Sequence, residues 1–166
     1  MRVISYVPRT IQQELHGFEF LMTGYDTAVK IQEVTISVNG TFRNGMFSAP
    51  HFEGFVELDI YDSTIATWVN INFERNTRVS RSFRGFMRYI QSKPSVGEVM
   101  IHSGFFHTTD SEFSTILINH LTSIDGNPFS NPSRMIIAPA TDKESAKLVM
   151  QGFGLHWTGA IMQIIK

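Results

Sequence analysis

The most concentrated chemistry in this 166-residue sequence is a group of five arginines between positions 75 and 88. Arginine presents a planar fork of donors that matches phosphate and carboxylate oxygens, so the group predicts a phosphate or nucleic-acid contact or an acidic protein partner. Four of the five are spaced three, three and four residues apart, which would place them on one ridge of a helix. The alternative is an ordinary solvated helix face. The ridge consists of Arg78, Arg81, Arg84 and Arg88, and Arg75 precedes it.

A second set of polar residues alternates with apolar ones between positions 55 and 61. Glu57, Asp59 and Tyr61 fall on one face of a predicted strand, opposite an apolar face. Alternating acids are also routine on the exposed face of a sheet. A chemical role for these carboxylates therefore depends on the fold that carries them.

Composition removes several classes of site. The chain has no cysteine, which excludes disulfides, zinc-thiolate sites and a cysteine nucleophile. Its histidines show no metal-binding spacing, so we expect no metal. A net charge of -1 argues against a general polyanion binder, although a local basic patch fits within that total. No apolar run is long enough for a signal peptide or a membrane span, so we expect a soluble, cytoplasmic protein.

The elements that position these residues are predicted from hydrophobic periodicity. Residues 55–61 and 65–73 alternate on either side of a short turn, which predicts an antiparallel hairpin. Residues 81–92 carry apolar side chains at helical spacing, which predicts a helix with the arginine ridge on its opposite side. The remaining predictions for the first part of the chain are a helix at 10–25, strands at 1–8, 28–38 and 98–106, and a loop at 42–52.

The last third of the chain is predicted as strand, capped helix, strand, capped helix, strand. Residues 109–112 and 141–144 each begin with threonine and end with glutamate before an apolar run, which is the pattern of a capping box. Residues 135–138 and 161–165 are short apolar runs typical of strands. The sequence therefore predicts one α/β domain (an α+β mixed sheet) over residues 1–166, with a central antiparallel hairpin and a C-terminal β-α-β-α-β unit.

This order of elements resembles the GNAT (N-acyltransferase-like) fold, in particular the small, divergent GNAT-like proteins of tailed phages. The family's turn and helix, of the form R-G-x-G-x-G-x-x-L-L-x-x-x-L, corresponds to residues 109–121, which keep the apolar positions and have Ser114 at the last glycine. The family's later N-x-x-A-x-x-x-Y-x-x-x-G-F segment corresponds to residues 143–155, with Ala146 and Gly154 in register.

The resemblance implies an acyl-CoA-dependent N-acyltransferase that transfers an acyl group to a small-molecule or protein amine. Glu57 or Asp59 would be the catalytic base, directly or through water. Acyl-CoA would bind at the N-terminus of the predicted helix, where backbone N–H groups face the pyrophosphate. The residues implied in acyl-CoA binding are Thr109, Asp110, Ser111, Phe113 and Ser114.

The same segments lack the family's arginine and glycines, and Met150 stands at the position of the family's tyrosine acid. Asp110 and Glu112 would stabilise a helix start but repel a pyrophosphate there. The alternative is therefore a non-catalytic phage-type virion or host-takeover binding protein on a degenerate GNAT scaffold. It would contact a protein or acidic partner through the arginine ridge or through exposed aromatic side chains, in the virion or the host cytoplasm.

Overall fold

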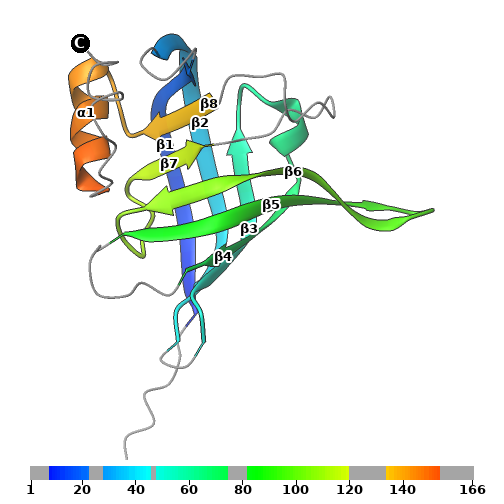
Figure 1. The fold of residues 1–166 in the computed structure, drawn as a ribbon. Helices are drawn as coiled ribbons and strands as arrows, with labels where there is room; N and C mark the ends of the chain where they lie inside the picture. Colours follow the sequence, from blue (N-terminus) through cyan, green and yellow to red (C-terminus); the bar gives the residue numbers. More distant parts are fainter. Residues whose placement is uncertain (1–7, 23–27, 46–47, 75–81, 120–133, 154–166) are drawn as a thin grey trace, which may run out of the picture.

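The computed structural model describes residues 8–22, 28–45, 48–74, 82–119 and 134–153. Within these ranges, eight antiparallel strands close into a barrel in which each strand pairs with its neighbours in the chain and β1 pairs with β8 (Figure 1). The elements are β1 (Arg9–Met22), β2 (Ala28–Arg43), β3 (His51–Leu58), the short 3-10 helix η1 (Asp62–Thr64), β4 (Trp68–Phe73), β5 (Phe83–Lys93), β6 (Gly97–Thr108), β7 (Ile116–Asn119), β8 (Arg134–Ala138) and α1 (Lys143–Gly152).

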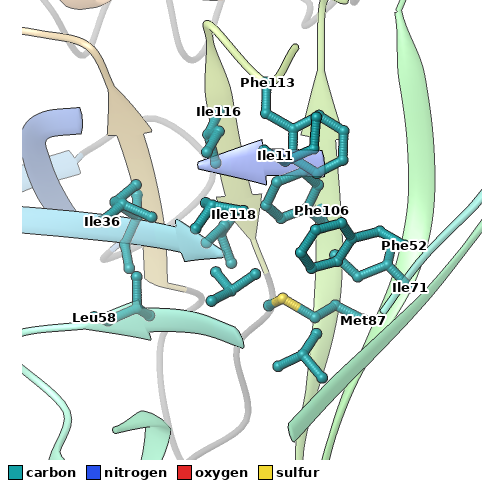
Figure 2. Close-up of a cluster of buried hydrophobic side chains, with 14 of the residues drawn as sticks. Ile11, Ile36, Phe52, Leu58, Ile71, Met87, Phe106, Phe113, Ile116 and Ile118 are labelled. Carbon is teal, nitrogen blue, oxygen red and sulfur yellow. The ribbon is translucent and has the colours of Figure 1, made fainter. Parts of the chain in front are cut away.

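Alternating burial along the strands separates the barrel interior from its outer surface. In β3 every second residue, from Phe52 to Leu58, is buried, and the residues between them face outwards. Eight strands enclose an interior just wide enough to be filled by side chains. Figure 2 shows this filling, with inward side chains from strands all around the barrel, among them Ile11, Ile36, Phe52, Leu58, Ile71, Met87, Phe106, Ile116 and Ile118.

Glycine allows the closest approaches between strands. A Cβ atom on Gly17 would lie 2.0 Å from the backbone oxygen of Ile137, across the seam where β1 meets β8. Gly40 and Gly54 face each other across β2 and β3, and a Cβ atom on Gly54 would lie 2.5 Å from the Cα atom of Gly40. Any side chain at these positions would push neighbouring strands apart.

Phenylalanine rings close one end of the barrel. Phe113, in the β6–β7 loop, is fully buried and has a φ of 59°. Its ring centroid lies 5.3 to 6.0 Å from four other phenylalanine rings. Each such contact contributes about 0.5–1.5 kcal/mol beyond burial, which together exceeds the roughly 1–2 kcal/mol cost of a left-handed backbone. The four rings belong to Phe42, Phe52, Phe73 and Phe106.

Helix α1 covers the outer surface of the barrel over β1, β7 and β8 (Figure 1). Phe18, Leu117 and Ile137 are buried outside the barrel interior, in a second cluster that includes Ala146 of the helix and Phe153 just after it. Together with the barrel interior, this second cluster forms the hydrophobic core. In the described ranges, no helix is long and apolar enough to cross a membrane.

The predicted mixed α/β, GNAT-like fold is wrong, because the described chain is an antiparallel barrel with one α-helix. The helices predicted at 10–25 and 81–92 are the strands β1 and β5. Both segments also contain an alternating pattern, and the barrel uses that pattern to bury Ile11, Met87 and Tyr89. Pairing with a neighbour on each side satisfies the backbone of both strands, and this tertiary pairing overrides a helical periodicity.

The helix predicted after residues 109–112 is also wrong. The Asp110 carboxylate accepts hydrogen bonds from the backbone N–H groups of Glu112 (2.8 Å) and Ser114 (3.2 Å), which closes a turn in a loop rather than starting a helix. The apolar run that follows is the strand β7, whose four residues are all buried. A strand between two neighbours and beneath a helix is covered on both faces, so its sequence does not alternate.

The second box, at residues 141–144, does start a helix, and α1 confirms that prediction. The cap is one residue later than predicted, since the Asp142 carboxylate accepts from the Ser145 N–H (2.8 Å) and the Ser145 hydroxyl accepts from the Asp142 N–H (3.0 Å). The predicted hairpin and the strands at 28–38, 98–106 and 135–138 are confirmed by β3–β4, β2, β6 and β8. The strands predicted at 1–8 and 161–165 fall largely or wholly outside the described residues.

Candidate functional site

The two carboxylates predicted as a catalytic base hold backbone in place. Glu57 accepts a hydrogen bond from the backbone N–H of Ala66 (2.8 Å), a residue with a φ of 52°. Asp59 accepts from the backbone N–H of Thr35 (2.9 Å). These bonds tie the β3–β4 connection to β3 and to β2, which gives both acids a structural role at the end of β3.

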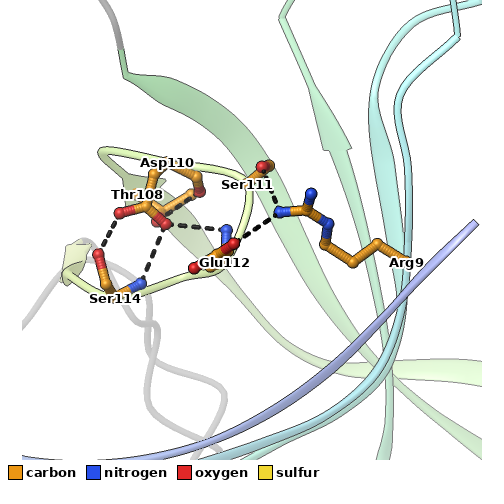
Figure 3. A network of polar contacts seen from close by, with 6 residues as sticks. All are labelled: Arg9, Thr108, Asp110, Ser111, Glu112 and Ser114. Atoms are coloured by element: carbon orange, nitrogen blue, oxygen red, sulfur yellow. Dashed lines mark hydrogen bonds and ion pairs between the residues drawn. The ribbon is translucent and has the colours of Figure 1, made fainter.

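The residues predicted to bind acyl-CoA form the loop that closes the opposite end of the barrel (Figure 3). The Asp110 carboxylate is the acceptor at the centre of this loop, bonded to two backbone N–H groups and to the Ser114 hydroxyl. Partial burial alone would raise the pKa of Asp110, but the hydrogen bonds from Ser114, Glu112 and Thr109 lower it below its usual value. The donors that a pyrophosphate would need are therefore already bonded to a carboxylate.

Arg9 fastens the same loop to β1. Its guanidinium donates to the Ser111 hydroxyl (3.0 Å) and to the Glu112 carboxylate (3.1 Å). Phe113, the next residue of the loop, points into the core. The loop is thus a structural plug, and it lies about 20 Å from Glu57 because β3 runs from one end of the barrel to the other.

At the end of the barrel near Glu57, a buried polar cluster joins four segments of the chain. The Glu19 carboxylate is fully buried and accepts hydrogen bonds from the Tyr61 hydroxyl, from Gln32 (2.9 Å) and from Arg134 (3.3 Å). Arg134 also donates to the Tyr61 oxygen (2.6 Å). Burial, with the neighbouring Glu19, raises the pKa of Tyr61 to about 12.

This cluster contains an ion pair between a fully buried carboxylate, Glu19, and a partly exposed guanidinium, Arg134, and Tyr61 bonds to both. Such pairs fix an arrangement of elements more than they add stability, and removing one partner is costly. Here the cluster joins β1, β2 and β8 to the β3–β4 connection. Sequence reasoning missed Glu19, although a single acid between Phe18 and Phe20 is a signal that could have found it.

Two of the four predicted contact arginines lie on the outer face of β5. Arg84 and Arg88 are on the same side of the strand, with Phe86 between them. The Arg84 guanidinium lies 4.9 Å from the centroid of the Phe105 ring. The Nε atom of Arg88 is buried and has no hydrogen-bond partner within the described part of the chain. Arg78 and Arg81 lie outside the described residues.

Exposed apolar side chains gather around these arginines. Trp68 is 46% exposed and packs edge-on against Phe55, with ring centroids 5.5 Å apart. Phe86 is 40% exposed and packs in the same way against Phe105, at 5.7 Å. Six large apolar side chains are exposed in the described ranges, and five of them lie on β4, β5, β6 or their connections: Ile65, Trp68, Phe86, Val96 and Met100, the sixth being Leu148 on α1.

Strand register arranges the outward residues of β3–β6 into continuous rows. One row is apolar, and runs through Phe55, Trp68, Ile90 and Met100. The next row is polar, and runs through Glu53, Asn70, Arg88 and Ser103. We call these two rows, together with Arg84, Phe86 and Phe105, the outer patch.

The outer patch has the composition of a protein contact surface. Aromatic residues, methionine and arginine are enriched in such surfaces, whereas lysine is depleted, and the patch contains no lysine. It borders a two-stranded ribbon in which β5 and β6 continue together beyond β4 (Figure 1). Among the described residues, no group of three histidines or acids could hold a metal ion.

Comparison of the chain with protein-family models, with curated proteins and with solved structures finds no match. The outer patch is therefore identified by its own geometry and composition.

Proposed function

We propose that this protein is a non-catalytic binding protein that contacts another protein surface through the outer patch. The observation that carries the proposal is that three of the six exposed large apolar side chains of the described residues, Trp68, Phe86 and Met100, lie together in the outer patch. A contiguous exposed apolar patch with a polar surround is typical of a protein interaction site.

The arginines indicate the charge of the surface that binds there. In the described part of the chain, neither Arg84 nor Arg88 forms an ion pair, and the Arg88 Nε atom is buried without a partner. An arginine on an outer face without an ion pair gains from a charged acceptor, so we expect a carboxylate of the bound protein to meet the Arg88 guanidinium. Nucleic acid fits less well, because the patch includes the aliphatic residues Ile90 and Met100 and the acid Glu53.

Acyl transfer is not proposed, because that interpretation depended on the GNAT-like fold. Acyl-CoA binding stays a prediction, and the residues implied in it form the loop around Asp110, where the backbone N–H groups of Glu112 and Ser114 already bond to the Asp110 carboxylate. A cytoplasmic location, or one in a virion or its host's cytoplasm, likewise stays a prediction.

The test is affinity capture from an extract of the source cells with four baits: the wild type, Trp68→Asp, Arg88→Glu and Leu148→Asp. Leu148 is the matched control, since it is 68% exposed and lies on α1 rather than in the outer patch. We expect a protein that the wild type and Leu148→Asp capture and the two patch variants do not. Capture that is identical for all four folded baits would contradict the proposal.

A further inference from the structure

The polar row of the outer patch carries opposite charges at positions related by symmetry. In the polar row, Glu53 lies on β3 and Arg88 lies on β5, with Asn70 of β4 between them. In the apolar row, Phe55 and Ile90 lie at equal distances on either side of Trp68. Neighbouring strands are about 4.8 Å apart, so each pair is separated by about 10 Å across β4.

A half-turn about an axis parallel to β4 exchanges the two sides of this surface. A second copy of the chain, turned in this way and placed face to face with the first, has its β5 opposite β3 of the first copy. Positions along the axis do not change, so each residue faces the second copy's residue from the same row. Glu53 therefore faces Arg88 of the second copy, Arg88 faces Glu53, and Trp68 faces Trp68.

We infer that the outer patch binds a second copy of this chain in a two-fold symmetric contact of this kind. The inference rests on the proposed function, since it names the partner of the same surface. A two-fold contact is the commonest way in which soluble chains associate, and it requires a self-complementary surface. The rows supply both the charge complementarity and an apolar centre.

Both charged groups have bonding capacity left for such a contact. The Arg88 side chain is half-buried on the outer face of β5 and forms no ion pair within the described part of the chain. The Glu53 side chain is 35% exposed, and its Oε2 atom accepts from Arg43 at 2.7 Å, while its Oε1 atom lies 3.8 Å from the Nε2 atom of His51. Oε1 is thus the oxygen that Arg88 of the second copy would reach.

The size of the patch sets the expected strength. Two packed sheets lie about 10 Å apart and contact through interdigitated side chains. A stable complex buries about 800 Å² on each partner, and two rows across four strands of a convex barrel offer less. We therefore expect a monomer–dimer equilibrium that depends on concentration rather than an obligate dimer.

The experiment is sedimentation equilibrium over a concentration series, on Arg88→Glu alone, on Glu53→Arg alone and on their equimolar mixture. Each single variant places like charges opposite each other twice in its own dimer, and we expect its association to weaken about tenfold or more. In the mixture, each copy supplies what the other lost. The unaltered Glu53 of the first variant faces the unaltered Arg88 of the second, and the two introduced side chains, one acidic and one basic, face each other in the same way. The mixed dimer should therefore form.

The controls separate this inference from the proposed function. Trp68→Asp should not dimerise, and Leu148→Asp should dimerise as strongly as the wild type. A wild type that stays monomeric throughout, or a dimer indifferent to the patch variants, overturns the inference. If such a monomer still captures another protein through Trp68, the proposed function stands and the partner is a different acidic protein. If it captures none, both fail.

Discussion

Two outer surfaces of the barrel carry apolar side chains, and only one of them is covered within the described residues. Over β1, β7 and β8, the outward residues Phe18, Leu117 and Ile137 are buried beneath α1. Over β4, β5 and β6, the outward residues Trp68 and Phe86 are roughly 40 to 46% exposed.

The difference shows two ways in which an outward apolar face of the same barrel can be buried. Each outward apolar face costs free energy while it is exposed to water, because burial stabilises by about 25 cal/mol per Å² of apolar surface. The helix supplies that burial for the first face within the chain. In the proposed function, the outer patch obtains that burial by binding a second surface, so the first face would contribute to stability and the patch to interaction.

The largest expected loss of stability comes from a substitution in the apolar face that α1 covers. Phe153 is 1% exposed and packs in the cluster beneath α1. Phe153→Ala should lower the free energy of unfolding by about 3–5 kcal/mol, as measured by urea denaturation. Phe86→Ala, at a 40% exposed position in the outer patch, is the matched control and should lower it by less than about 1 kcal/mol. Equal losses would show that the two faces do not differ.

A smaller effect comes from the start of the helix that covers the first face. Asp142→Ala removes the carboxylate that accepts from the Ser145 N–H at 2.8 Å. Loss of an N-cap lowers the free energy of unfolding by about 1 kcal/mol. Asp142→Asn keeps an acceptor and should cost only a few tenths of this. Thermal denaturation of the three proteins measures the difference, and an unchanged midpoint for Asp142→Ala would exclude the cap.

The polar cluster of Glu19, Tyr61 and Arg134 should make stability depend on pH, whereas the two outer apolar faces should not. Because the pKa of Tyr61 is raised from 10.0 to about 12 in the folded protein, folding favours the neutral phenol. Its contribution is complete below pH 10 and is lost as the pH rises through 12. The free energy of unfolding of Tyr61→Phe should therefore fall less steeply with pH than that of the wild type over that range. Denaturation followed by circular dichroism at several pH values measures this slope. Trp68→Asp should show the wild-type dependence of stability on pH. If Tyr61→Phe also shows the wild-type dependence, Tyr61 is not the group responsible for it.

The smallest expected loss of stability comes from a substitution on the outer patch. Trp68→Asp changes a half-exposed side chain on the outer patch and should alter the free energy of unfolding by less than about 0.5 kcal/mol. The same variant should lose association with its partner, as measured by sedimentation. A large loss of stability would instead make Trp68 part of the core.

Part of this fold follows from local sequence. Alternation in β2, β3, β4 and β6 predicts strands because a period of two is set by the backbone itself. The box before α1 predicts a helix for an equally local reason, since Asp142 and Ser145 bond to neighbouring N–H groups. The similar box at residue 110 closes a turn, because the residues after it pair as β7 between β6 and β8.

The predicted contact residues show the same division. Arg84 and Arg88 share a face in a helix and also in a strand, because their spacing of four residues suits both. Their neighbours could not be predicted, since Trp68 and Phe105 reach them only through the register of β4, β5 and β6. The sequence presents the carboxylates Glu57 and Asp59 as free for chemistry, whereas the fold bonds them to the backbone N–H groups of Ala66 and Thr35.

By itself, the sequence determined where the chain alternates, where α1 starts and which chemical groups are absent. Tertiary structure alone decided that β1 and β5 are strands, that Phe113 fills a barrel end and that Glu19 is buried against Arg134. The physical reason is barrel closure. It pairs β1 with β8, more than a hundred residues later, and such long-range pairing sets which side of every strand faces the core and which faces a partner.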